Sequence, residues 1–262
     1  MSGGALGHLH AVMARQDVPH ALLRERLALA ASEGLMRLSG RPERAGQLRD
    51  EVHLLRPGDQ PGPAGALYQQ WRRAVACAIS AQALHKALPE AAPQQIRTWL
   101  GAGRGAAVTR GAATLEAVLA AAPREEAAAL ILADAALARA LGWARVVPLL
   151  AIGLTRRDLR NTGEELRRAC HRAILVAAPE AARMAADLTK GAQRLRDVAP
   201  RLRAKGAGEA VDLFLCRDAL SPSLALSRVM SDRAARRLCD RLVALGAVRE
   251  LSGRDTFRLY GV

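Results

Sequence analysis

Apolar residues recur at intervals of three and four along most of the chain, which is the repeat of an α-helix with one buried face. Over residues 20–38 this interval is kept by Leu23, Leu27 and Leu35, and Gly40 then ends the helix. Similar spacing predicts further helices over residues 45–55, 68–88, 114–121, 124–141, 149–154, 164–178 and 179–198. Alternating apolar and polar residues, the pattern of a β-strand, are found only in the last fifteen residues. The sequence therefore predicts helices for most of the chain.

Segments rich in proline and glycine divide the predicted helices into groups. Residues 56–65 contain three prolines and three glycines, which excludes regular structure and predicts a rigid, extended turn. Residues 101–111 are rich in glycine and predict a loop, and residues 200–208 have the composition of a hinge. We therefore expect two parts, a helical body over residues 1–205 and a smaller unit over residues 206–262.

The smaller unit shows the order of elements that is typical of a winged helix-turn-helix. Its pattern predicts a helix over residues 209–217, a short helix over 223–228 and a longer helix over 232–245. Two short strands, 248–251 and 256–260, then flank a turn that contains glycine and form a hairpin. The expected fold class is thus all-α, a multi-helix body followed by a C-terminal winged helix with three helices and a short β-hairpin.

The longer helix of this unit separates apolar from basic residues. Its apolar positions Ala235, Leu238, Leu242 and Leu245 step by three, four and three residues and would face the core. The opposite face carries the arginines Arg233, Arg236, Arg237 and Arg241. An α-helix fits the major groove of DNA, where arginine binds guanine edges or phosphates. The pattern therefore predicts DNA contact through this face.

Arg254, in the predicted hairpin turn, is a further candidate for DNA contact. An arginine in a wing can reach the minor groove or the phosphate backbone. Two other interpretations of the arginine-bearing helix stay open: a solvated helix face, or a surface for another protein, since winged helices also serve as dimerisation and scaffold modules.

Charge and composition leave these alternatives open. The chain has 39 Lys and Arg residues against 25 Asp and Glu residues, a formal net charge of +14, which suggests a polyanionic partner. Nearly all of the basic residues are arginine, however, and an excess of Arg and Ala also arises in proteins from GC-rich genomes. The basic excess is spread along the chain, so net charge alone does not identify the partner.

The residues that usually carry catalysis or bind metals form no convincing motif. The four cysteines are far apart, which indicates a reducing compartment and no disulfide framework. His8 and His10 lack further nearby ligands, and the glycines at 101, 103 and 105 lack the spacing of a phosphate-binding loop. We therefore expect no metal, no cofactor and no catalytic residues in a protein that is not an enzyme.

The sequence also carries no pattern for membrane insertion or secretion. The N-terminal residues lack the apolar stretch behind a charged start that marks a secretory signal. Nor does any segment offer about 18 uncharged apolar residues in a row. These observations predict a cytoplasmic protein that does not enter the membrane.

Four segments, in order, resemble one bacterial family. They are residues 55–65 (LRPGDQPGPAG), 141–151 (LGWARVVPLLA), 201–208 (RLRAKGAG) and the tail over 231–262. Together they resemble the family called domain of unknown function 1403, found in alphaproteobacteria and often on plasmids. The resemblance implies a bacterial, cytoplasmic protein and supplies no reaction. The tail also resembles the C-terminal winged helix of other alphaproteobacterial proteins, including some Fic-type enzymes, although the Fic catalytic motif is missing from this sequence.

These observations lead to one principal expectation and two alternatives. The principal expectation is a bacterial regulator or plasmid-associated factor that binds double-stranded DNA through the winged helix, while the helical body forms a homodimer or binds a partner. The first alternative is a non-catalytic adaptor whose winged helix contacts protein. The second is an enzyme with an unrecognised all-helical pocket, which would need a buried polar cluster in a cleft of the body.

Overall fold

Helices form most of the computed structural model, which describes residues 2–41, 43–56 and 58–262. The helices of the body are α1 (Ser2–Met13), α2 (His20–Leu38), α3 (Ala45–His53), α4 (Pro63–Ala76), α5 (Ala81–His85), α6 (Pro93–Leu100), α7 (Ala107–Ala121), α8 (Glu126–Ala140), α9 (Leu150–Gly153) and α10 (Gly163–Val198). Short 3-10 helices at Asp158–Arg160 and Ala199–Arg201 flank α10. The C-terminal unit, residues 206–262, contains α11 (Ala207–Cys216), α12 (Pro222–Ala225), α13 (Asp232–Ala244), β1 (Arg249–Glu250) and β2 (Tyr260–Gly261). The expected all-α character is confirmed, with only one small sheet among the described residues.

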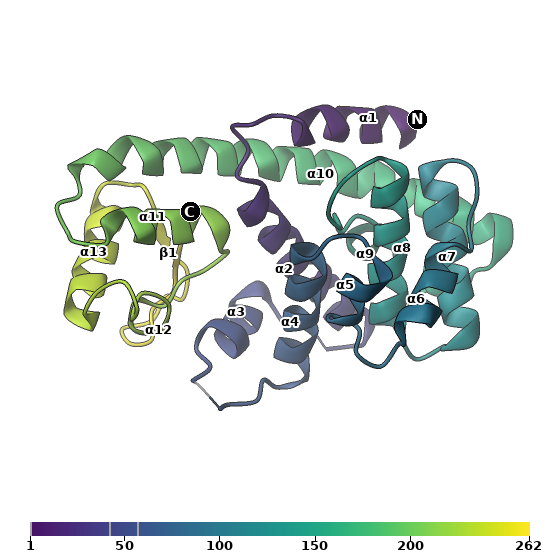
Figure 1. Ribbon diagram of the computed structural model, residues 1–262, viewed down its shortest axis with the longest axis horizontal. Helices are drawn as coiled ribbons and strands as arrows, with labels where there is room; N and C mark the ends of the chain where they lie inside the picture. The colour runs from purple at the N-terminus through teal and green to yellow at the C-terminus, as the bar shows by residue number, and fades with distance from the viewer. Residues whose placement is uncertain (1, 42, 57) are drawn as a thin grey trace.

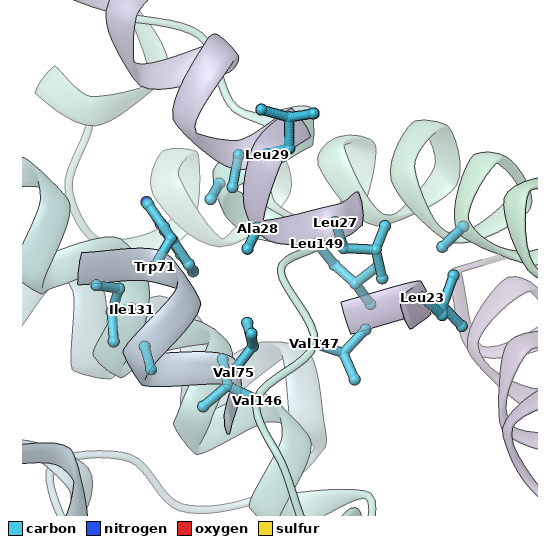
Figure 2. Packing of buried hydrophobic residues seen from close by; sticks show 14 of the residues in the cluster. Leu23, Leu27, Ala28, Leu29, Trp71, Val75, Ile131, Val146, Val147 and Leu149 are labelled. Atoms are coloured by element: carbon cyan, nitrogen blue, oxygen red, sulfur yellow. The ribbon is translucent and has the colours of Figure 1, made fainter. Parts of the chain in front are cut away.

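The core of the helical body lies around α2, α4 and α8. Figure 2 shows Leu27 and Ala28 of α2, Trp71 and Val75 of α4 and Ile131 of α8 gathered about one interior. Apolar residues occupy nearly every face of α8, and a helix of that kind is stable only when it is buried on all sides. α7, α6, α9 and α4 pack on α8, while α2 packs on α4 and α10.

Asp134 is a fully buried acidic residue of this helix, and its role is structural. Its carboxylate accepts N–H hydrogen bonds from Leu149 (3.0 Å), Leu150 (2.8 Å) and Ala151 (3.2 Å). These N–H groups belong to the start of α9, where a helix has no internal partner for them. Asp134 therefore joins α9 to α8 and leaves no free carboxylate oxygen for chemistry.

α10 is one continuous helix of 36 residues that links the body to the C-terminal unit. α1 packs along it (Figure 1). The prediction of two helices separated at Pro179 is wrong. Proline cannot donate to the carbonyl group of Leu175, but Leu175 and Pro179 both lie on the exposed side, where water can bind that carbonyl. Within the described ranges no helix, α10 included, combines the length and the apolar character needed to cross a membrane.

Other boundaries differ from the prediction for local reasons. α1 was not predicted because its glycines weaken the helical pattern, yet Leu6 and Leu9 are buried in it. α4 begins at Pro63, since proline suits the first position of a helix, and ends well before residue 88. α7 begins inside the predicted loop over residues 101–111. Pro57, part of the predicted turn over 56–65, lies outside the described residues.

The C-terminal unit places a small sheet beside its three helices, on the left of Figure 1. β1 and β2 are antiparallel, with Arg249 opposite Gly261 and Glu250 opposite Tyr260. Leu220, just before α12, forms a further antiparallel bridge with Tyr260. β1 is shorter than the predicted strand over 248–251, and β2 shares only Tyr260 with the predicted strand over 256–260, because residues 251–259 form an irregular loop.

Candidate nucleic-acid interface

α13 presents its arginines to solvent because its other face is anchored in the core. Ala235, Leu238, Cys239 and Leu242 are its buried residues, and the helix packs on α12. The residues on the opposite face of α13 do not take part in this core. The structure places all four predicted arginines of this helix on the exposed surface: Arg233, Arg236, Arg237 and Arg241.

These arginines differ in their ionic partners. Arg236 forms an ion pair with Asp232, one turn earlier, with 2.9 Å between Nη2 and Oδ2. Both side chains are more than half exposed, and such surface pairs contribute little. The other three make no ion pair with any residue that the structure describes. Most of the positive charge of α13 is therefore not neutralised within the chain.

Arg237 and Arg241 lie on one wall of a groove between α13 and the segment that follows α10. The groove has a volume of about 540 Å³ and its lining residues are Arg201, Leu202, Arg203, Ala204, Ala234, Arg237, Leu238 and Arg241. Half of these described residues are arginines and none is acidic. We call this feature the arginine groove.

A second groove, of about 350 Å³, lies on a different side of α13, toward the loop between β1 and β2. Its lining residues are Ser221, Pro222, Ser223, Arg236, Asp240, Asp255, Thr256, Phe257, Arg258 and Tyr260. Here two carboxylates, of Asp240 and Asp255, balance two guanidinium groups. The unbalanced positive charge of α13 is therefore concentrated on the side of the arginine groove.

Arg254, the arginine predicted in the wing, is turned toward the helical body. Its guanidinium group forms an ion pair with Asp50 of α3. The loop is also held from within, because the Glu250 carboxylate accepts hydrogen bonds from the backbone N–H groups of Ser252 (3.2 Å) and Gly253 (2.8 Å). A phosphate that approached Arg254 would have to compete with the carboxylate of Asp50.

A buried cluster around Asp218 fixes the C-terminal unit to the body. The carboxylate of Asp218 is fully buried and receives two hydrogen bonds from Arg49 of α3, Nε to Oδ2 at 2.6 Å and Nη2 to Oδ1 at 3.0 Å. Arg26 of α2 forms a second ion pair with it and also donates to the carbonyl oxygen of Val262 at 2.8 Å. The Tyr68 hydroxyl lies 3.4 Å from Oδ2. The body thus supplies two positive charges to this contact, and the C-terminal unit supplies the negative charge between them.

The electrostatics of the cluster favour a charged Asp218. Burial alone would raise the pKa of Asp218, but the hydrogen bond from Arg49 and the charges of Arg26 and Arg49 hold that pKa below its ordinary value. Burial, followed by the charge of Arg72, lowers the pKa of His53 to about 3. His53 is therefore neutral at physiological pH and adds no further charge to the cluster.

The sequence could not reveal the Asp218 cluster, whereas it offered part of the signal for the arginine groove. Arg26, Arg49, Tyr68 and Asp218 come from separate segments, and no spacing relates them. Arg201 and Arg203 stood in the predicted hinge, where a run of basic residues was visible but its position beside α13 was not.

Cys170 and Cys239, two of the four cysteines, are buried. Burial raises the pKa of both Cys170 and Cys239 to about 12, so neither forms the nucleophilic thiolate near neutral pH. No group of three or more His, Cys, Asp or Glu side chains lies together among the described residues in a way that could hold a metal ion.

The structure thus defines a mostly helical protein with a small antiparallel sheet and an arginine-rich surface near its C-terminus. The chain belongs to the family described as "Protein of unknown function (DUF1403)", whose family model matches residues 1–262. The resemblance carried by the four sequence segments is therefore confirmed. No curated protein matches the chain.

Proposed function

We propose that the protein binds duplex DNA through α13 and its surroundings, as a bacterial, cytoplasmic regulator or plasmid-associated factor. One observation carries this proposal: α13 exposes a row of arginines, and three of them have no carboxylate partner among the described residues. Arginine is suited both to guanine edges and to phosphates. Phosphates that neutralise such a face release the counterions of the DNA, and this release favours binding.

The arrangement of the C-terminal unit supports the proposal. Helix α11, the short α12, the amphipathic α13 and the β1–β2 hairpin follow one another in the order of a winged helix. Leu220 beside Tyr260 adds the short strand segment that precedes α12 in such units. We therefore propose that residues 206–262 form a winged helix in which α13 enters the major groove.

The contacts of Arg254 make it a lesser contributor in this proposal. Its ion pair with Asp50 must open, or include the phosphate as a third partner, before the wing can bind DNA. The body would then hold the DNA-binding unit in a fixed orientation and offer its own surface to a second copy or another partner. No reaction is part of this proposal.

A protein-binding adaptor is the second candidate, and one feature favours it. Phe257 is 63% exposed at the end of the β1–β2 loop, with a φ of 55° that non-glycine residues rarely adopt. Exposed aromatic side chains of this kind are typical anchors of protein interfaces. If the adaptor role is the main one, the wild-type chain will not retain duplex DNA even at low salt.

Electrophoretic retention of a random-sequence duplex tests the proposal. Affinity should fall steeply with salt, because each phosphate contact releases counterions. About four to six contacts give a log–log slope of roughly −4 to −5. The triple variant Arg236→Glu/Arg237→Glu/Arg241→Glu should lose this retention.

A matched control variant separates the effect of losing the binding site from the effect of changing the net charge. Arg156, Arg157 and Arg160 are exposed and stand at the opposite end of α10, about 50 Å away at 1.5 Å per residue. Their replacement by Glu changes the net charge by the same amount. Retention that survives in this control and disappears in the α13 variant supports the proposal, whereas equal losses in both, or a wild-type slope near zero, contradict it.

A further inference from the structure

The arginine groove differs from four other grooves of the described surface in having no acidic residue in its lining. The groove beside the β1–β2 loop includes Asp240 and Asp255. The groove under α10 is also basic, but it includes Asp187, and two of its arginines, Arg26 and Arg183, already form ion pairs. Two grooves near the start of α10 include carboxylates as well, from Glu116 and Glu126 in one and from Asp158 and Glu165 in the other. Only the arginine groove, among these five, brings guanidinium groups together without an acidic residue in its lining.

Two of its arginines come from outside α13, and the backbone holds them in place. Arg201 ends the short 3-10 helix after α10, and the N–H group of Leu202 donates to the carbonyl oxygen of Ala199 at 3.1 Å. Arg203 follows, and Ala204 accepts a hydrogen bond from Ala207 at 3.0 Å. The segment predicted as a hinge is therefore an ordered connection between two helices.

Gly206 presses this segment against the turn before α13. Its φ is 83°, a conformation that suits glycine, and a Cβ atom at this position would lie 2.6 Å from Cγ1 and 2.8 Å from the carbonyl oxygen of Val229. Only a glycine allows so close an approach. The arginines at 201 and 203 are thus held beside Arg237 and Arg241 before any ligand arrives.

We infer that the arginine groove is a preformed site for the sugar-phosphate backbone of duplex DNA, with Arg201 and Arg203 as DNA-binding residues beside Arg237 and Arg241. The inference rests on the proposed function and adds to it which arginines of α13 contact phosphates and which contact bases. Four guanidinium groups without carboxylates repel one another and attract counterions, which a phosphodiester backbone displaces on binding. Arg233 and Arg236, which lie nearer the start of α13 and outside this groove, are then the residues left for base edges.

The salt dependence of duplex binding tests this inference. Removal of a residue that contacts phosphate weakens binding about equally for all sequences and reduces the salt slope by about 1. The variant Arg201→Gln/Arg203→Gln should therefore bind every duplex more weakly, with a slope that is shallower by about 2. Its loss of affinity between 50 and 200 mM salt should be about tenfold smaller than that of the wild type.

The variant Arg156→Gln/Arg160→Gln is the matched control, because these exposed arginines line a groove that contains carboxylates. Its slope should equal that of the wild type. Thermal unfolding of both variants should match the wild type, since all four side chains are exposed. A wild-type slope that persists in Arg201→Gln/Arg203→Gln overturns the groove inference and leaves the proposed function standing. A wild type that fails to bind duplex DNA at low salt overturns both.

Discussion

Two arginine-rich regions of this protein differ in the burial of their arginines and in the carboxylates that accompany them. At the Asp218 cluster, Arg26 and Arg49 have side chains only 14% and 12% exposed and share one buried carboxylate. In the arginine groove, four arginines are exposed and no carboxylate lines the groove. The first region uses arginine to hold two parts of the chain together, and the second leaves arginine free for a ligand.

The comparison shows why the net charge of +14 is a poor guide to the partner. A guanidinium group that already has a carboxylate contributes to the total charge but offers little to a phosphate. The ionic partners of each arginine, which only the folded chain reveals, separate the structural arginines from the available ones. The following predictions change one region while the other serves as the reference.

Removal of the shared carboxylate should have the largest effect on stability. Asp218→Ala leaves Arg26 and Arg49 buried without a counter-charge, and breaking a buried pair in this way costs about 3–5 kcal/mol. Urea unfolding at neutral pH measures the loss. A loss below about 1 kcal/mol would show that the two guanidinium groups reach solvent and that the cluster does not hold the C-terminal unit.

Truncation of the buried face of α13 should have the next largest effect. Leu242 is fully buried, so Leu242→Ala should cost about 2–5 kcal/mol from lost burial and the cavity left behind. Val243 is 39% exposed, and Val243→Ala should change the stability by no more than about 0.5 kcal/mol. Thermal or urea unfolding compares them, and equal effects would mean that the basic face, and not the apolar one, packs on the core.

Acid should reduce the contribution of the Asp218 cluster to the free energy of unfolding. The pKa of Asp218 is lower in the folded chain than in the unfolded chain, where it is about 3.9. Its contribution to stability is therefore complete well above pH 4 and is lost as the pH falls through that value and below it. The difference in unfolding free energy between the wild type and Asp218→Asn should shrink between pH 6 and pH 3. A constant difference over this range would rule out a charged Asp218 as the source of the stability.

Release of Arg254 should have the smallest effect on stability and an opposite effect on binding. Asp50→Asn breaks a partly exposed ion pair, which costs at most about 1 kcal/mol. Arg254 then joins the unpaired arginines, so duplex affinity should rise and the salt slope should steepen by about 1. Calorimetric unfolding and a salt series of duplex titrations check both effects. Weaker duplex binding would instead indicate that Asp50 positions the wing for DNA.

Local sequence pattern predicted the elements well where packing follows periodicity. The buried stripe of α13, its exposed arginines and its C-terminal end near Gly246 all follow from residue spacing within one helix. The prediction was wrong at Pro179, where the long α10 continues because the proline lies on the solvent side. α1 was missed because its glycines hide a helix that packing on α10 stabilises.

Contacts between distant segments could not be predicted in the same way. Asp218 gave no sign of two arginine partners, since those partners are about 170 and 190 residues away in the chain. Arg203 carried a visible charge, but its place beside Arg237 depends on how Gly206 packs against Val229. The candidate site was therefore half visible in the sequence: the helix was predicted, and the second wall of its groove was not.

Arginine footprinting would test the comparison most directly. The protein is treated with a dicarbonyl reagent such as phenylglyoxal, with and without a random-sequence duplex at low salt, and the modified arginines are identified by mass spectrometry. We predict that Arg26 and Arg49 stay unmodified in both samples, that Arg156 and Arg160 are modified in both, and that the duplex protects Arg201, Arg203, Arg237 and Arg241. Modification of these four that is unchanged by DNA, or protection spread evenly over all exposed arginines, would contradict a binding surface at the arginine groove.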